Sequence, residues 1–174
     1  MADTLAHPPA AGNGASQAEE MTPDDLWVVG AALVHDGRVL AARRAPHVAD
    51  RGLWELPGGK PEAGESATDA LRRELREELS LEIKVGKFLG RGTARRTDGR
   101  HILLDVYLAA SADDKAPSPG RLIAHDAIRW LAADELSTVD WAAADRPLLP
   151  DLAAALRRDA QPGDASERRM KRAY

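Results

Sequence analysis

The chain has 174 residues, 44% hydrophobic and 30% charged, which is typical of one soluble globular domain. A net charge of −4 provides no global positive field, so a nucleic-acid polymer is not expected as a partner. The sequence has no cysteine, no apolar run near the ~20 residues that span a bilayer and no signal-peptide pattern, which together predict a cytoplasmic protein without disulfides or a membrane partner.

The two ends of the chain differ in composition from the part between them. Residues 1–24 are rich in Ala, Gly, Pro and acidic residues, and we expect them to form a disordered leader. Residues 159–174 are polar and end with several basic residues, which favours a solvated tail over a phosphate-binding arm. The sequence therefore predicts a single domain over residues 25–158.

The domain is predicted to begin with a β-hairpin. A continuous apolar run over 26–35 is followed by Asp36-Gly37, a strong two-residue hairpin turn, and by a second strand over 38–42. A loop follows, and it contains the run Pro57-Gly58-Gly59. This run allows a tight turn in which backbone groups can approach an anion or a metal ion.

Helix and strand patterns alternate in the rest of the domain. Residues 66–79 are predicted to be a helix, since Ser66 can cap it and Ala and Leu recur on one face. Three further strands are predicted over 81–93, 102–109 and 127–131. Asp145 can act as the N-cap of a last helix. This order predicts an α/β fold with a mixed sheet sandwiched between helices.

Three glutamates share one side of the predicted helix. Glu74, Glu77 and Glu78 stand at positions i, i+3 and i+4, late in the helix, where the helix dipole disfavours negative charge. A hard divalent cation among these carboxylates would offset their repulsion. A solvated face with neighbouring arginines as salt-bridge partners is the alternative interpretation.

The spacing before the glutamates decides between these two interpretations. Gly59 is followed by five residues and Glu65, and then by seven residues and the run Arg73-Glu74-Leu75-Arg76-Glu77-Glu78. This pattern resembles the Nudix box over residues 59–81. It departs from the box only at Ser80, where the pattern has glycine.

The resemblance implies a fold with a mixed sheet between helices and the hydrolysis of a nucleoside diphosphate linked to a further group. It also implies that Glu74 and Glu78 ligate Mg²⁺, with Mn²⁺ as an alternative cofactor. Glu77 would assist through water or as a third ligand, and the Gly58 carbonyl would be a further ligand. Arg73 and the first glutamate of the box would orient these ligands.

Outside the box, the chain is similar to MutT-type nucleoside triphosphate pyrophosphohydrolases over roughly residues 26–156. The similarity is carried by residues 40–44, 52–60 and 141–147. It implies that a nucleoside triphosphate is cleaved to the monophosphate and pyrophosphate. Expected substrates are a modified nucleotide such as 8-oxo-dGTP, or else CTP or dCTP.

The same resemblance suggests residues that contact the substrate. Arg44 and Gly59 would contact phosphate, while Arg100 and Asp145 would lie near the base. An aspartate at position 145 can accept a hydrogen bond from the exocyclic amino group of cytosine, or can contact the altered edge of 8-oxoguanine. A helix N-cap for Asp145 and a solvated side chain for Arg100 are the alternatives.

A second departure from the relatives concerns the general base. In MutT-like proteins an acidic residue commonly stands six places before a tryptophan, and here that place is Ala124. Three explanations are open: a neighbour such as His125 or Asp126 substitutes, a box glutamate (Glu77 or Glu78) is the base, or activity is reduced. The third leaves a catalytically weak domain that senses or binds nucleotides as a second hypothesis.

The remaining residue types add little to these hypotheses. The five histidines show no paired metal-ligand spacing, so each is expected to be structural or solvated. The sequence does not distinguish a monomer from a homodimer.

Overall fold

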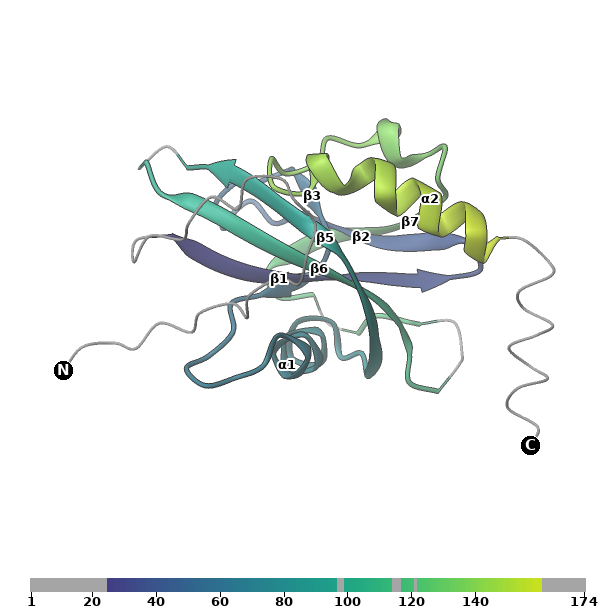
Figure 1. Ribbon diagram of the computed structural model, residues 1–174, viewed down its shortest axis with the longest axis horizontal. Helices are drawn as coiled ribbons and strands as arrows, with labels where there is room; N and C mark the ends of the chain where they lie inside the picture. The colour runs from purple at the N-terminus through teal and green to yellow at the C-terminus, as the bar shows by residue number, and fades with distance from the viewer. Residues whose placement is uncertain (1–24, 97–98, 114–116, 121, 161–174) are drawn as a thin grey trace.

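The computed structural model describes residues 25–96, 99–113, 117–120 and 122–160 (Figure 1). The predicted leader and all but two residues of the predicted tail lie outside the described residues. In chain order the elements are β1 (Leu26–His35), β2 (Arg38–Arg44), β3 (Trp54–Glu55), β4 (Gly58–Gly59), α1 (Ala67–Leu79), β5 (Ile83–Arg95), β6 (His101–Ser111), β7 (His125–Leu131), two 3-10 turns η1 (Leu136–Thr138) and η2 (Arg146–Leu148), and α2 (Leu149–Asp159).

The strands form a mixed sheet, as the sequence predicted. The order along the sheet is β3-β2-β1-β6-β5, with β4 paired to β1 and β7 paired to β2. The pair β1 and β6 is parallel, from Leu26 opposite Ile102 to Leu33 opposite Ala109, and the other pairs are antiparallel. The parallel pair lies at the centre of the sheet.

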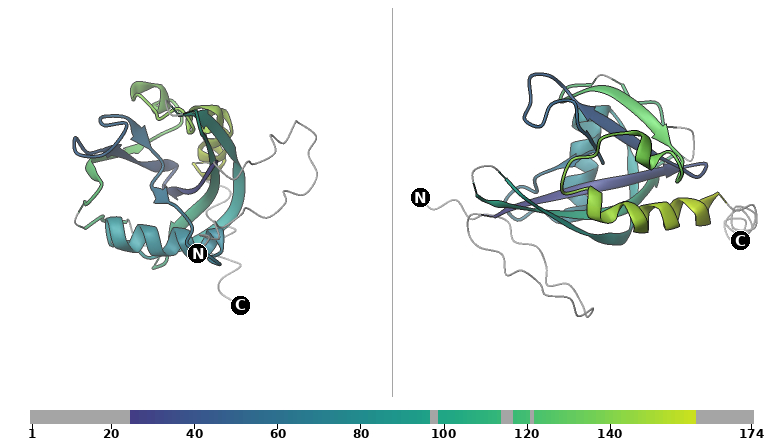
Figure 2. Two further views of the ribbon diagram at one scale, coloured as in Figure 1. Left: turned by 90° about the vertical axis from the view of Figure 1, so that its left-hand side faces the viewer. Right: turned by 90° about the horizontal axis from the view of Figure 1, so that it is seen from above.

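The sheet lies between two helical layers, with α1 on one face and α2 with the 3-10 turns on the other (Figures 1 and 2). Successive residues of a strand point to opposite faces. Val29, Ala31 and Leu33 of β1 therefore pack in the apolar cluster under α1, while Ala32 belongs to the cluster under α2. The predicted α/β sandwich is confirmed.

Helix α1 forms where the sequence predicted it. The side chain of Ser66 caps its N-terminus by accepting a hydrogen bond from the Asp69 N–H at 3.1 Å. Its apolar stripe is buried against β1 and β5, and each buried leucine stabilises the fold by roughly 2 kcal/mol. The stripe consists of Ala67, Ala70, Leu71, Leu75 and Leu79. Ser80 ends the helix with φ 57°, a left-handed conformation that glycine adopts more cheaply, by about 1 kcal/mol.

The predicted N-cap role of Asp145 is wrong. Asp145 precedes the turn η2 and makes no capping hydrogen bond, and α2 begins only at Leu149. The reason is that the Asp145 carboxylate is directed to a different backbone group, because its Oδ1 accepts a hydrogen bond from the Leu56 N–H at 3.0 Å. The side chain thereby joins the loop before α2 to the segment between β3 and β4.

Candidate active site

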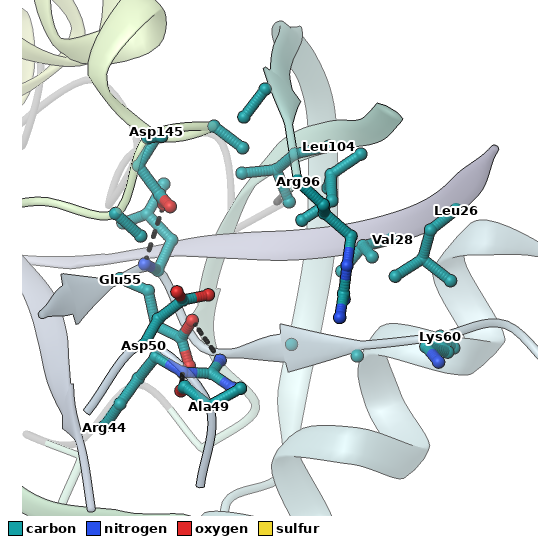
Figure 3. A pocket seen from close by; sticks show the side chains of 18 of the residues that line it. Leu26, Val28, Arg44, Ala49, Asp50, Glu55, Lys60, Arg96, Leu104 and Asp145 are labelled. Carbon is teal, nitrogen blue, oxygen red and sulfur yellow. Dashed lines mark hydrogen bonds and ion pairs between the residues drawn. The ribbon is translucent and has the colours of Figure 1, made fainter. Parts of the chain in front are cut away.

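A cleft of about 500 Å³ lies beside β1, the ends of β5 and β6, and the loop before η2 (Figure 3). Its apolar wall is formed by Leu26, Val28, Ile102, Leu104 and Ala142 to Ala144. Its charged residues are Arg44, Asp50, Glu55, Lys60, Arg95, Arg96 and Asp145. An apolar wall facing a small set of charged groups suits a small molecule that has both a flat apolar part and charges.

The two glycines of β4 line this cleft and bring it into contact with α1. A Cβ atom on Gly58 would lie 2.0 Å from the Val29 carbonyl oxygen, so only glycine can pair this closely with β1. A Cβ atom on Gly59 would lie 2.3 Å from Oε1 of Glu74. Gly59 therefore allows the Glu74 carboxylate to lie directly against the backbone at the cleft wall.

Arg73 joins the carboxylates of the box. Its Nε and Nη2 donate to the two oxygens of Glu65, at 2.9 and 2.8 Å, and its Nη1 lies 3.0 Å from Glu74 and 3.4 Å from Glu77. Nη2 also donates to the Lys60 carbonyl at 3.1 Å. The hydrogen bonds from Arg73 lower the pKa of Glu65. The bond to the Lys60 carbonyl joins α1 to the segment from Pro57 to Lys60, called here the glycine loop.

Glu78 is the box carboxylate most affected by its surroundings. Its pKa is raised to about 7, mainly by burial and also by the negative charges of Glu74 and Glu55, against the opposing effects of His125 and Arg44. Its side chain is 23% exposed. A cation bound beside Glu78 would stabilise the ionised form of this carboxylate.

A chain of polar contacts runs from the cleft to Glu78. Arg44 Nη1 donates to Glu55 Oε2 at 2.7 Å, and Glu55 Oε1 lies 2.9 Å from Nε2 of His125. Burial opposes the ionisation of Glu55, but the hydrogen bond to His125 and the charge of Arg44 outweigh it and lower the Glu55 pKa. The other ring nitrogen of His125, Nδ1, lies 3.8 Å from Oε2 of Glu78.

The residues around Ala124 face in different directions. The Ala124 carbonyl accepts a hydrogen bond from the Ala45 N–H at 2.9 Å. Asp126 forms an exposed ion pair with Arg43, at 2.7 Å. His125 is therefore the neighbour of Ala124 that contacts the box. No metal-ligand spacing in the sequence marked His125, and its position directly after Ala124 was the one available signal.

Asp145 lies on the opposite side of the cleft from Lys60 in Figure 3. Its side chain is almost fully buried, and burial raises its pKa to about 8. The effect of burial outweighs the hydrogen bond from the Leu56 N–H, which favours the charged form. Asp145 therefore offers the cleft a carboxyl group whose charge depends on pH near neutrality.

The structure brings most of the predicted substrate-contacting residues together. Arg44, Gly59 and Asp145 all line the cleft. Arg100 does not line it, but Arg95 and Arg96, at the end of β5 and directly after it, do. Sequence reasoning missed these two, because the extent of β5 decides which arginine reaches the cleft.

The box residues fit a hard divalent cation by their chemistry. Glu74, Glu77 and Glu78 supply only oxygen donors, and the contact between Gly59 and the Glu74 carboxylate leaves room for no other side chain there. Within the described ranges, no three acidic or histidine side chains are already arranged as a closed ligand set. The Glu77 side chain is 59% exposed, so it is free to turn toward a cation bound beside the other two glutamates.

Comparison with known proteins places the chain in a family. The sequence profile of the NUDIX domain matches residues 24–152. The CTP pyrophosphohydrolase of Escherichia coli (strain K12) is 38% identical over 141 residues, which cover 80% of this chain and 98% of that protein. The putative 8-oxo-dGTP diphosphatase 2 of Mycobacterium tuberculosis (strain ATCC 25618 / H37Rv) is 39% identical over 132 residues, or 74% and 89% of the two chains. The chain belongs to the Nudix family.

Solved structures agree with this assignment. The solution structure of the E. coli ORF135 protein has a TM-score of 0.64 at 36% identity, covering 80% of this chain and 94% of that one. The crystal structure of a MutT NUDIX hydrolase from Burkholderia pseudomallei has a TM-score of 0.64 at 31% identity, covering 73% and 97%. The chain is a MutT-like Nudix hydrolase that acts on diphosphate bonds. None of the described helices is long and apolar enough to cross a membrane.

Proposed function

We propose that the protein is a Mg²⁺-dependent enzyme that converts a nucleoside triphosphate to the monophosphate and pyrophosphate. The observation that carries this proposal is the position of Gly59, which lines the cleft and also contacts the carboxylate of Glu74. A nucleotide whose base lies against the apolar wall would extend its phosphates along the glycine loop. The phosphates would then reach the acidic side of α1.

The residues of the box divide between binding a cation and orienting its ligands. Glu74, Glu78 and the carbonyl of Gly58 would hold the cation, with Glu77 as a further or water-mediated ligand. Arg73 would keep the carboxylates oriented through the contacts described above. A divalent cation held there neutralises the diphosphate and makes water a competent nucleophile near neutral pH.

The reaction consumes one water molecule. Water adds across the phosphoanhydride bond between the α- and β-phosphates, and that bond breaks to release the monophosphate and pyrophosphate. The proton from water goes to a box glutamate, Glu77 or Glu78, since Ala124 offers no acid and Asp126 is paired with Arg43. Arg44, held by Glu55 at the edge of the cleft, would contact a phosphate.

Base selection is proposed to depend on Asp145. As a carboxylate it accepts a hydrogen bond from an exocyclic amino group, and as a carboxylic acid it donates one. The relatives named for CTP and for 8-oxo-dGTP support these two nucleotides as the first to test. Arg95 and Arg96 line the cleft, while a base contact by Arg100 stays a prediction.

A nucleotide panel tests this function. Pyrophosphate release from CTP, dCTP, 8-oxo-dGTP and the four standard deoxynucleotides is measured with Mg²⁺, for the wild type and for Glu78→Gln. We expect turnover of at least one nucleotide, reduced by more than about 100-fold in the variant. If the wild type binds nucleotides but turns over none faster than Glu78→Gln, the second hypothesis, a nucleotide-binding module, replaces the enzyme.

Asp145→Asn on the same panel tests the base contact. An amide can both donate and accept, so its pattern differs from that of either form of the acid. We expect the ranking of nucleotides that differ in the base to change in the variant. The preference between ribonucleotides and deoxyribonucleotides should change less. An unchanged order would remove Asp145 from base selection while leaving the reaction itself intact.

A further inference from the structure

Asp50 combines an unusual backbone conformation with a position in the cleft. Its φ is 55°, in the left-handed region that residues other than glycine rarely adopt. The described residues include two other non-glycine positions of this kind, and both are ordinary: Asp36 lies in the hairpin turn and Ser80 ends α1. Asp50 instead lines the cleft. Strained backbone of this kind persists where the surrounding structure imposes it, and it is concentrated at ligand sites.

Arg44 holds the loop that carries Asp50. The backbone of Arg44 closes the loop between β2 and β3, because its N–H donates to the Leu53 carbonyl and its carbonyl accepts from the Gly52 N–H, both at 2.9 Å. Its side chain enters the loop, where Nε donates to the carbonyl of Ala49. The N–H of Leu53 also donates to the Asp50 carbonyl at 3.2 Å. Asp50 is therefore fixed relative to Arg44 through the residue before it and through the turn after it.

The carboxylate of Asp50 is open to a ligand. The residue is exposed in the cleft, and within the described residues its carboxylate makes no hydrogen bond or ion pair. Figure 3 shows Asp50 beside Arg44, on the side of the cleft away from Leu26 and Val28. An ionised carboxylate can only accept hydrogen bonds, and it repels phosphate groups. The part of a nucleotide that suits it is therefore a neutral hydrogen-bond donor.

The sugar of a bound nucleotide supplies such donors at this place. In the proposed function the base lies against the apolar wall and the phosphates extend along the glycine loop, so the sugar lies between them. Arg44 would contact a phosphate, and its side chain also holds the carbonyl of Ala49, the residue before Asp50. Asp50 is thereby placed next to the phosphate contact, where the sugar joins the phosphate chain. The hydroxyl groups of the sugar are neutral donors.

We propose that Asp50 is a specificity-determining residue whose carboxylate accepts a hydrogen bond from a sugar hydroxyl of the bound nucleotide. This inference rests on the proposed function, and it concerns the sugar, whereas Asp145 concerns the base. A hydrogen bond to a charged acceptor contributes about 10- to 100-fold in affinity. Removing the carboxylate should therefore weaken the binding of only those nucleotides that carry the hydroxyl.

Two variants remove or weaken the acceptor without disturbing the backbone. Asp50→Gly adopts a positive φ without strain, and Asp50→Asn tolerates it while exchanging the charged acceptor for a neutral one. Asp36→Gly is the matched control, because Asp36 is also exposed, has φ 48° and does not line the cleft. The nucleotides supply a second control, since a loosened loop would weaken the binding of every sugar equally.

Calorimetry with Mg²⁺ measures the Kd of three probes that differ only in the sugar. For cytosine, the probes are the α,β-methylene analogues of CTP, dCTP and 2′,3′-dideoxy-CTP; if the nucleotide panel favours another base, the same three sugars are carried on that base. The methylene group replaces the oxygen of the bond to be cleaved, so binding is measured without turnover.

The expected result is a loss of affinity that depends on the sugar. For Asp50→Gly we expect Kd raised by about tenfold or more for the ribonucleotide and changed by less than about twofold for the dideoxy analogue. The deoxy analogue should follow the ribonucleotide if the 3′-hydroxyl is bound, and the dideoxy analogue if the 2′-hydroxyl is bound. Asp50→Asn should show a smaller loss with the same dependence on the sugar, and Asp36→Gly should match the wild type throughout.

An equal change in Kd for all three sugars would overturn the inference. Equal weakening would mean that Asp50 contacts the base or only shapes the loop, and equal tightening would mean that it only repels phosphate. Unchanged affinities would overturn it as well. A wild type that binds none of the probes would instead overturn the proposed function, and this inference with it. A wild type that hydrolyses no nucleotide, but binds the probes with the expected dependence on the sugar, would refute the enzyme and support the role of Asp50.

Discussion

Replacing Asp145 by asparagine should make the protein more stable at high pH. Asp145 is only 3% exposed, and burial raises its pKa from 3.8 to about 8. A group whose pKa is higher in the folded state stabilises the fold below its unfolded pKa, and that contribution is lost as pH rises to its folded pKa. Asparagine does not titrate, and its side-chain oxygen can still accept the hydrogen bond from the Leu56 N–H.

The magnitude follows from the size of the shift. Each unit of difference between the folded and unfolded pKa is worth about 1.4 kcal/mol, so a shift from 3.8 to about 8 has an upper bound of roughly 6 kcal/mol. Water that enters the cleft beside Asp145 reduces the penalty of the charged form. We therefore expect Asp145→Asn to gain about 2 kcal/mol or more over the wild type between pH 5 and pH 8.

Urea unfolding at pH 5, 6, 7 and 8 measures this difference directly. All other titrating groups are shared by the two proteins, so their effects cancel when the free energies of unfolding are subtracted. Asp151→Asn, on the exposed side of α2, is the matched control and should show no pH-dependent gain. A difference between Asp145→Asn and the wild type that stays constant from pH 5 to pH 8 would refute the buried-acid explanation.

Three further predictions concern the glycine loop and the box. Gly59→Ala should weaken Mn²⁺ binding by about tenfold or more with little change in Tm, because the added Cβ displaces the Glu74 carboxylate. Gly58→Ala should instead lower Tm, because its Cβ would meet the backbone of β1. Equal losses of Tm in the two variants would contradict this contrast. Arg73→Lys should weaken Mn²⁺ binding by about 10- to 100-fold, because a lysine cannot donate to both oxygens of Glu65 at once. Calorimetric titration with Mn²⁺ measures this affinity, and an unchanged value would contradict the prediction. Mn²⁺ affinity should rise with pH through about 7, as Glu78 loses its proton, and should depend much less on pH in Glu78→Gln.

The sequence predicted the regular elements because their signals are local. The hairpin turn at Asp36-Gly37 and the cap at Ser66 depend on residues a few positions apart, and both are present, with φ of 48° and 69° in the turn. The Nudix box is also contiguous, so its residues could be read without the fold. The bounds of β5 and β7 were less accurate, because sheet pairing decides where a strand ends.

The candidate site combines local and distant residues, and only the local ones were fully predictable. Arg44 and Asp145 were proposed from resemblance and do line the cleft, but the sequence left open an N-cap role for Asp145. The hydrogen bond to Leu56, 89 positions away, removes that alternative. Glu55 and Lys60 stand beside the box in sequence, yet no pattern marked them as cleft residues.

The sequence by itself determined the family, the helix that carries the three glutamates and the Pro57-Gly58-Gly59 turn, because spacing along one helix and one turn fixes which side chains share a face. The tertiary structure decided which neighbour of Ala124 contacts the box and which side chains line the cleft. Those outcomes depend on the bulge between β2 and β7, on the register of β5 with β6, and on the burial of His125 between Glu55 and Glu78. Such contacts join segments tens of residues apart, and the sequence carries no local signal for them.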